Sequence, residues 1–238
     1  MNVDAIIFDK DGTLMDFDSF WLNITHAALK EMLKKLRAEH VPTEALLTAL
    51  GVQDNHTEVD GVLCYGTYRQ MGDVLFTVLH EHGCVCTLEE VRELTVEAYH
   101  NNISAGIAEA ACSDIHSVLQ KLRDCGLTLA VVTTDDPYVT KKCLQTLEIA
   151  SYFDVVYTHD GILPPKPDPF CIFDFCKKTG FAPEEIVMVG DTMTDIRFAA
   201  NGGIRVIGVA KSERSRKLLE TEADAVVQDI SCVYDVLT

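Results

Sequence analysis

Apolar runs and amphipathic segments alternate along much of this chain. The apolar runs predict six strands: residues 3–8, 127–132, 153–157, 186–189, 205–209 and 225–227. Apolar residues at helical spacing predict four helices among the later strands: residues 113–125, 137–147, 168–180 and 192–200. Strands that alternate with helices form a mostly parallel sheet covered on both faces. We therefore expect an α/β protein with a doubly wound, mostly parallel sheet.

The chain between the first two strands predicts helices alone. Helical spacing marks four of them: residues 19–36, 43–50, 73–82 and 88–99. Ser19 is the expected cap of the first helix. Residues 51–72 contain several glycines and show no clear period, which predicts a loop with short turns. Residues 16–109 are therefore expected to form a smaller helical domain, inserted after the first strand into a core of residues 1–15 and 110–238.

Composition and charge narrow the classes of partner. The chain has 238 residues, of which 47% are hydrophobic and 24% are charged, as in an ordinary globular protein. Its formal net charge of -17 argues against binding to nucleic acid or to an anionic membrane, because both favour basic surfaces. An anionic substrate would need a local device to overcome this charge, and a bound divalent cation is the natural candidate.

The cysteines favour a reducing compartment. There are nine, an odd number without regular spacing, and several lie within apolar periodic segments. The N-terminus has no signal-peptide pattern, and no apolar run approaches the ~18 residues that span a membrane. We expect a cytoplasmic protein whose thiols are reduced and buried. We also expect a monomer or a small homo-oligomer.

Polar residues gather where the predicted strands end. Asp9 and Asp11 follow the first strand, and Thr133 follows the second. Lys166 lies in a proline-rich segment, and Asp191 follows the strand 186–189 with Asp195 shortly after it. The carboxyl ends of parallel strands share one edge of the sheet, where ligands bind, so these side chains are predicted to converge.

These residue types favour phosphate chemistry with a magnesium ion. Carboxylates from two strands, with no cysteine or histidine among them, are ligands for a hard cation such as Mg²⁺. A lysine and a threonine hydroxyl can bind the oxygens of a phosphoryl group. Of two acids near one cation, one can act as a nucleophile while the other transfers a proton.

Each of these residues also has an ordinary structural explanation. Asp11 precedes Gly12, and Asp-Gly is a common turn pair. Thr133 could satisfy a backbone group, Lys166 could lie in solvent, and the acids after residue 190 could stabilise the start of a helix. The occurrence of all four groups in this order, each at a predicted strand end, favours a functional site.

The same four groups resemble the sequence motifs of the haloacid dehalogenase superfamily. They are Asp9-Lys10-Asp11-Gly12-Thr13, Thr133, Lys166 with its Lys-Pro-Asp-Pro context, and Gly190-Asp191-x-x-x-Asp195. The arrangement is most similar to the branch of phosphoglycolate phosphatase and β-phosphoglucomutase, and the inserted helical segment is similar to the cap domain of that branch. The motifs are specific for the superfamily and much less specific for the substrate.

The resemblance implies a role for each residue. Asp9 would be the nucleophile that becomes an aspartyl-phosphate, and Asp11 would protonate the leaving oxygen and later activate water. Thr133, Thr134 and Lys166 would bind the phosphoryl oxygens. The ligands of Mg²⁺ would be Asp9, Asp191 and the backbone carbonyl of Asp11. Asp195 would act through a water molecule or by orienting Lys166.

The implied activity is the Mg²⁺-dependent hydrolysis of a small phosphorylated metabolite, similar to phosphoglycolate or a sugar phosphate. A phosphomutase of the β-phosphoglucomutase type is an alternative, in which the aspartyl-phosphate is protected from water. A non-catalytic regulator that binds a metabolite on the same fold is a second alternative. This second alternative predicts that at least one motif is broken, whereas all four motifs are intact.

Several charged residues are particular to this chain. Close relatives often have asparagine after the threonine of the second motif, whereas here Asp135 and Asp136 follow Thr134. We expect Asp136 to cap the helix that begins near Pro137. Lys10 is expected to leave the turn on the side away from the two acids, toward the cap or solvent.

Arg69, in the inserted segment, has two open interpretations. It could clamp a carboxylate or a second phosphate of the substrate, or it could form a surface salt bridge.

Overall fold

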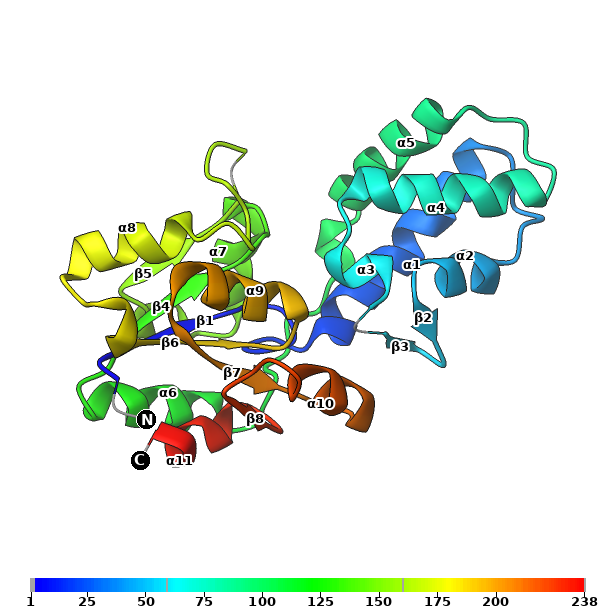
Figure 1. Ribbon diagram of the computed structural model, residues 1–238. Helices are drawn as coiled ribbons and strands as arrows, with labels where there is room; N and C mark the ends of the chain where they lie inside the picture. The colour runs from blue at the N-terminus through cyan, green and yellow to red at the C-terminus, as the bar shows by residue number, and fades with distance from the viewer. Residues whose placement is uncertain (1–2, 59, 160, 238) are drawn as a thin grey trace. The chain divides into compact units, whose positions relative to one another are not determined.

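The computed structural model describes residues 3–58, 60–159 and 161–237. The chain divides into two compact units (Figure 1). One contains Met1–Asp16 and Ala108–Thr238, and the other contains Phe17–Ile107.

The first unit is built on a sheet of six strands. They are β1 (Ala5–Phe8), β4 (Thr128–Val132), β5 (Val155–Tyr157), β6 (Ile186–Gly190), β7 (Arg205–Val209) and β8 (Ala225–Val227). Their order across the sheet is β5-β4-β1-β6-β7-β8, and every neighbouring pair is parallel. The predicted α/β class with a parallel sheet is therefore confirmed.

Helices cover both faces of this sheet. Residues of α6 (Ile115–Asp124), α7 (Pro137–Thr146) and α11 (Val233–Leu237) pack in one apolar cluster. Residues of α8 (Phe170–Thr179), α9 (Met193–Gly202) and α10 (Glu213–Leu219) pack in the other. Figure 1 shows α8 and α9 on one side of the sheet and α6 and α11 on the other.

The central strand shows why the sheet strands are continuously apolar. Ile6 and Phe8 of β1 belong to one cluster, and Ala5 and Ile7 belong to the other. Successive side chains of a strand point to opposite faces, and here both faces are covered, so all four residues are buried.

The order of the strands indicates where a sheet of this type binds its ligand. β1 lies between β4 and β6. From β1 the chain continues to β4 and β5 on one side and then crosses to β6, β7 and β8 on the other. The carboxyl end of β1 is therefore at the topological switch point, where open α/β sheets bind ligands.

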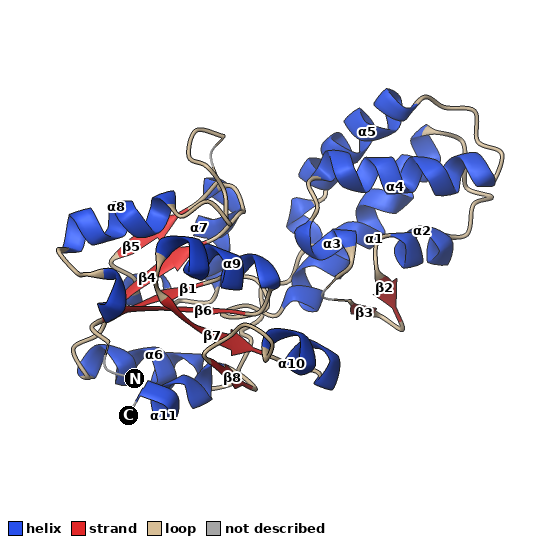
Figure 2. Ribbon diagram, viewed as in Figure 1, coloured by secondary structure: helices blue, strands red, loops and turns tan. Residues whose placement is uncertain are grey.

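The second unit is mainly helical (Figure 2). Its helices are α1 (Phe17–Lys35), α2 (Thr43–Ala49), α3 (Val62–Tyr65), α4 (Tyr68–Glu81) and α5 (Leu88–Asn101). A short antiparallel hairpin joins β2 (Val52–Gln53) to β3 (His56–Thr57). The buried Tyr99 of α5 donates a hydrogen bond to Thr25 of α1 over 3.0 Å, so the one polar atom of that ring has a partner inside the core.

Residues 51–72 contain more structure than the predicted loop. The hairpin occupies part of this stretch, with Asp54 and Asn55 at positive φ in its turn. Helix α4 begins at Tyr68 rather than at residue 73 because Thr67 and Gln70 form a capping box. The start of α1 is also corrected, since this helix begins at Phe17 and Ser19 lies inside it.

Two short helices near the C-terminus, α10 and α11, were not predicted. Helix α10 buries only Ser215 and Leu219, and α11 buries only Val233. Two buried positions or fewer are too few to reveal a period in the sequence.

All nine cysteines are free thiols. Cys84, Cys143 and Cys171 are buried, and Cys125 is exposed. Among the described residues, no helix combines the length and the apolar character that crossing a membrane requires.

Candidate active site

The predicted residues of the first unit lie around the carboxyl ends of the three central strands. Asp9 directly follows β1, and its backbone N–H donates to the carbonyl of Val189 on β6 over 2.8 Å. Thr133 directly follows β4, and its N–H donates to the carbonyl of Tyr157 on β5 over 3.0 Å. Asp191 directly follows β6. The sheet ladder therefore sets the backbone position of each of these residues.

Three carboxylates form one cluster at this edge. Oxygen atoms of Asp9, Asp191 and Asp195 all lie within 4.8 Å of one another. Asp9 and Asp195 are buried, and Asp191 is half-buried. The ammonium group of Lys166, itself buried, donates to Asp9 and, over 2.6 Å, to Asp195. Residues far apart in the sequence are thus brought together as their strand-end positions predict.

The electrostatics of this cluster favour an additional cation. Burial raises the pKa of Asp9 to about 7; Lys166 opposes this shift, whereas Asp195 and Asp11 add to it. Burial, followed by the charges of Asp9 and Asp195, also raises the pKa of Asp191 well above its ordinary value. Three carboxylates and one ammonium group leave two negative charges when all are ionised. A divalent cation would balance that excess.

Lys166 keeps its charge despite its burial. Burial alone lowers the pKa of a lysine, but the carboxylates of Asp195 and Asp9 overcome this effect and raise the pKa of Lys166.

Two glycines allow the carboxylates to approach the backbone. Gly12 has a φ of +81°, and a Cβ atom there would lie 1.9 Å from Oδ2 of Asp191. A Cβ atom at Gly190 would lie 2.5 Å from the Cβ of Asp195. Larger residues at these positions would displace the acids, so the glycines are part of the site.

Asp195 has two bonding partners that hold its carboxylate in place. Its Oδ2 accepts from the backbone N–H of Thr192 over 3.1 Å and from the hydroxyl of Thr192 over 2.6 Å, within the capping box that begins α9. Its Oδ1 accepts from Lys166. Asp195 therefore contacts Lys166 directly, and its role in the site stays a prediction.

Thr133 and Thr134 differ in exposure. The hydroxyl oxygen of the buried Thr133 accepts from the N–H of Asp135 over 3.2 Å, so it satisfies a backbone group at the strand end. A hydroxyl that accepts in this way can still donate its own hydrogen to a phosphoryl oxygen. Thr134 is exposed.

Asp11 and Asp135 contact a second buried lysine, Lys10. The side chain of Lys10 is fully buried, and its Nζ lies 2.7 Å from Oδ1 of Asp11 and 2.9 Å from Oδ2 of Asp135. The expectation that Lys10 extends toward the cap or solvent was wrong, because carboxylates on both sides of the ammonium group stabilise it inside the core unit. Burial raises the pKa of Asp135 to about 6, against the opposing charge of Lys10.

The predicted cap of α7 is confirmed. Oδ1 of Asp136 accepts from the N–H groups of Tyr138 and Val139 over 2.8 and 3.0 Å, and Pro137 occupies the first turn. The two acids after Thr134 therefore have separate structural partners.

Arg69 lies in the second unit, near the start of α4. Its Nη2 donates to both carboxylate oxygens of Glu89, over 2.6 and 2.9 Å, and about half of each side chain is exposed. Arg69 therefore forms a surface salt bridge, which is one of the two interpretations that the sequence allows. A role for Arg69 in substrate binding stays a prediction.

Sequence reasoning did not identify all the residues that shape the site. Thr13 is fully buried, and its hydroxyl donates a long hydrogen bond of 3.4 Å to Asp191. The pairing of Lys10 with Asp135 was also missed. A useful signal was available, because a lysine two residues after the end of a buried strand needs carboxylates nearby if it is buried too.

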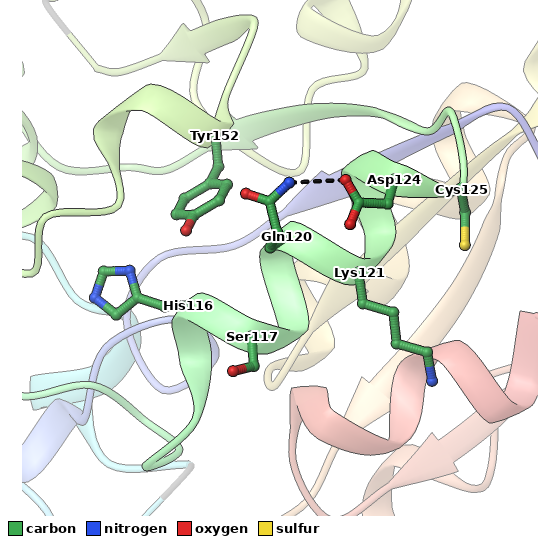
Figure 3. Close-up of a pocket in the computed structure, with 7 residues that line it drawn as sticks. All are labelled: His116, Ser117, Gln120, Lys121, Asp124, Cys125 and Tyr152. Atoms are coloured by element: carbon green, nitrogen blue, oxygen red, sulfur yellow. Dashed lines mark hydrogen bonds between the residues drawn. The ribbon is translucent and has the colours of Figure 1, made fainter.

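A shallow groove of about 570 Å³ lies elsewhere in the first unit (Figure 3). It follows the outer side of α6, where Gln120 donates to Asp124 over 2.8 Å. Its lining residues are His116, Ser117, Gln120, Lys121, Asp124, Cys125 and Tyr152. None of them belongs to the clusters at the strand ends, so the groove is separate from the candidate active site.

The family model for haloacid dehalogenase-like hydrolases matches residues 6–209, a range that includes all four motifs. The chain belongs to this family. It is 25% identical over 229 residues to a phosphoglycolate phosphatase of Nitrosospira multiformis, covering 96% of this chain and 92% of that protein. It is 23% identical to the pyrophosphatase PpaX of Oceanobacillus iheyensis, covering 100% and 98% of the two chains.

A solved structure agrees in fold. The crystal structure of a predicted phosphoglycolate phosphatase from Haemophilus somnus matches with a TM-score of 0.73 and 20% identity, covering 100% of this chain and 99% of the other. The family model confirms the expected superfamily, and this structure confirms the expected α/β fold.

Proposed function

We propose that this protein is a Mg²⁺-dependent phosphatase that hydrolyses a small phosphorylated metabolite through an aspartyl-phosphate. The observation that supports it most is the buried cluster in which Lys166 contacts Asp9 and Asp195 beside Asp191, at the switch point of the sheet. A lysine among three acids fits a site in which the ammonium group binds phosphoryl oxygens and a metal ion balances the charge of the carboxylates.

In the first step, a carboxylate oxygen of Asp9 attacks phosphorus and the ester bond to the leaving group breaks. Asp11 donates a proton to the leaving oxygen at the same time. Lys166 and the hydroxyls of Thr133 and Thr134 bind the phosphoryl oxygens as the negative charge moves among them.

In the second step, Asp11 takes a proton from a water molecule. The water oxygen attacks phosphorus, and the bond between phosphorus and Asp9 breaks. Inorganic phosphate leaves, Asp9 is again a carboxylate, and Asp11 again holds the proton that the next cycle needs.

The residues present fit a magnesium ion. The cluster offers carboxylate oxygens alone, it carries excess negative charge, and Gly12 leaves space for the close approach of Asp191. Asp9, Asp191 and the backbone carbonyl of Asp11 would hold the ion, which would supply positive charge to the phosphoryl oxygens.

The names of two relatives support a substrate class. One is named a phosphoglycolate phosphatase and another a pyrophosphatase. We propose a small anionic phosphate, such as phosphoglycolate or a sugar phosphate, with the helical unit Phe17–Ile107 acting as a cap that selects it.

A phosphate-release panel tests this function. Phosphoglycolate, sugar phosphates and pyrophosphate are assayed with Mg²⁺ and with EDTA, for the unmodified protein and for Asp9→Asn. We expect release of phosphate from at least one compound, with loss of activity in EDTA and in Asp9→Asn. Activity that survives either treatment would overturn the mechanism, and isomerisation of a sugar phosphate with little release would indicate a mutase.

A further inference from the structure

Two lysines are buried at the edge of the sheet, and each contacts two carboxylates. Lys166 contacts Asp9 and Asp195, and its function belongs to the site described above. Lys10 contacts Asp11 and Asp135, and no step of the proposed reaction uses it. A buried ammonium group is costly unless its partners are well placed, so the second arrangement needs an explanation of its own.

Asp135 is the fixed end of this arrangement. Its backbone N–H donates to the hydroxyl oxygen of Thr133 over 3.2 Å, and its carbonyl accepts from the N–H of His159 over 2.8 Å. The next residue, Asp136, caps α7. The backbone of Asp135 is thus held on both sides, and its Oδ2 lies 2.9 Å from the Nζ of Lys10 as the second member of an ion pair.

Asp11 is the end that does chemistry in the proposed reaction. Its side chain lies at the strand-end turn and is 16% exposed, which is more than for Lys10 and similar to Asp135. Its Oδ1 lies 2.7 Å from the Nζ of Lys10. An aspartate side chain has several staggered rotamers, and a charged hydrogen bond to a buried cation favours one of them.

We propose that Lys10 is a positioning residue: anchored on Asp135, it holds the carboxyl group of Asp11 in the orientation that proton transfer requires. The inference rests on the proposed role of Asp11. It also explains how Asp135 can lie beside a phosphate site. The ammonium group of Lys10 neutralises the carboxylate of Asp135, which therefore does not repel the substrate. The unit formed by Lys10, Asp11 and Asp135 couples the ends of β1 and β4.

The test compares Lys10→Met, Asp135→Asn and the double variant, with Asp11→Asn alongside. Lys178→Met is the matched control, since it removes an exposed ion pair with Asp174 on α8. The substrates are an alkyl phosphate, whose leaving group needs a proton, and p-nitrophenyl phosphate, whose leaving group does not. The readouts are kcat, KM, the initial burst of p-nitrophenol, and Tm.

We expect Lys10→Met to lower kcat for the alkyl phosphate by about 10²-fold, the size of effect that a misplaced catalytic group produces, with little change in KM. The burst of p-nitrophenol should persist, while its steady-state release falls because water activation still needs Asp11. The double variant should recover most of the Tm lost by Lys10→Met, since no unpaired acid is left at residue 135, yet kcat should stay low. Lys178→Met should behave as the unmodified protein.

Separate results would overturn the two proposals. If the double variant has the unmodified Tm and the unmodified kcat for the alkyl phosphate, Lys10 does not position Asp11. If Lys10→Met loses the burst as well as the steady-state rate and its Tm falls, Lys10 has a structural role alone, and this result also overturns the inference. If Asp11→Asn itself stays active, the proposed function fails at Asp11, and this result does not involve Lys10.

Discussion

The described ion pairs of this protein are of two kinds: the core unit has buried pairs, and both units have pairs that lie at least partly in solvent. In the core unit, Lys10 and Lys166 are buried, and each contacts two carboxylates. In the helical unit, the pairs formed by Arg69, Arg92 and Lys35 lie at least partly in solvent. Surface pairs are worth little and are screened by salt, whereas burying a charge costs several kcal/mol before its partners compensate. The buried pairs therefore depend on closely placed partners, whereas the exposed pairs of either unit contribute little to stability.

The strongest test of this comparison removes one buried and one exposed lysine. Lys166→Met leaves Asp9 and Asp195 without their cation and should lower the free energy of unfolding in EDTA by about 3–5 kcal/mol, the usual cost of breaking a buried pair. Phosphate release should fall to background. Lys178→Met breaks an exposed pair on α8 and should cost about 0.3–0.5 kcal/mol. Urea unfolding of both variants measures the difference, and equal costs would remove the distinction between buried and exposed ion pairs.

The sequence predicts the polar groups of the site well where strand ends determine their positions. Asp9, Thr133 and Asp191 each directly follow an apolar run, and parallel strands bring such positions to one edge. The sequence does not reveal which way a side chain leaves the turn after a strand. The predicted direction of the Lys10 side chain, away from the acids of the turn, is therefore wrong. Its partner Asp135 is an acid where close relatives often have asparagine nearby.

The helical unit was harder to predict for a different reason. Its long helices have clear stripes, but Gly61, Gly66 and Gly72 suggested a loop where α4 already begins at Tyr68. A capping box at Thr67 and Gln70 overrides the glycine signal because it satisfies the first backbone N–H groups of the helix. Local hydrogen bonds decided this boundary, and composition did not.

A second, smaller effect concerns the metal ion and pH. Burial raises the pKa of Asp9 from 3.8 to about 7, so between these values the folded protein holds a proton that the unfolded chain has released. The contribution of this group to stability is full below pH 4 and is lost as the pH rises toward 7. We expect the Tm of the unmodified protein in EDTA to fall over this range relative to that of Asp9→Asn.

Magnesium should reverse this fall, because a cation binds the ionised acids and not the protonated ones. The gain in Tm on adding Mg²⁺ should therefore be larger at pH 8 than at pH 5, and Asp9→Asn should show less of it. Thermal scans at both pH values measure the gain. A gain of the same size at both, in both proteins, would show that Asp9 is not part of the metal site.

The smallest expected effect concerns Arg69, the residue of the helical unit that the sequence predicts as a candidate clamp for the substrate. Arg69→Ala and Glu89→Ala remove the same exposed ion pair, and each should lower the free energy of unfolding by about 0.2–1 kcal/mol. If Arg69 also clamps a substrate anion, only Arg69→Ala should raise KM for phosphoglycolate, and neither variant should change KM for p-nitrophenyl phosphate. Steady-state kinetics of the two variants on both compounds make this comparison. The same loss for both substrates, or in both variants, would leave Arg69 as a surface charge and would complete the contrast between buried and exposed ion pairs.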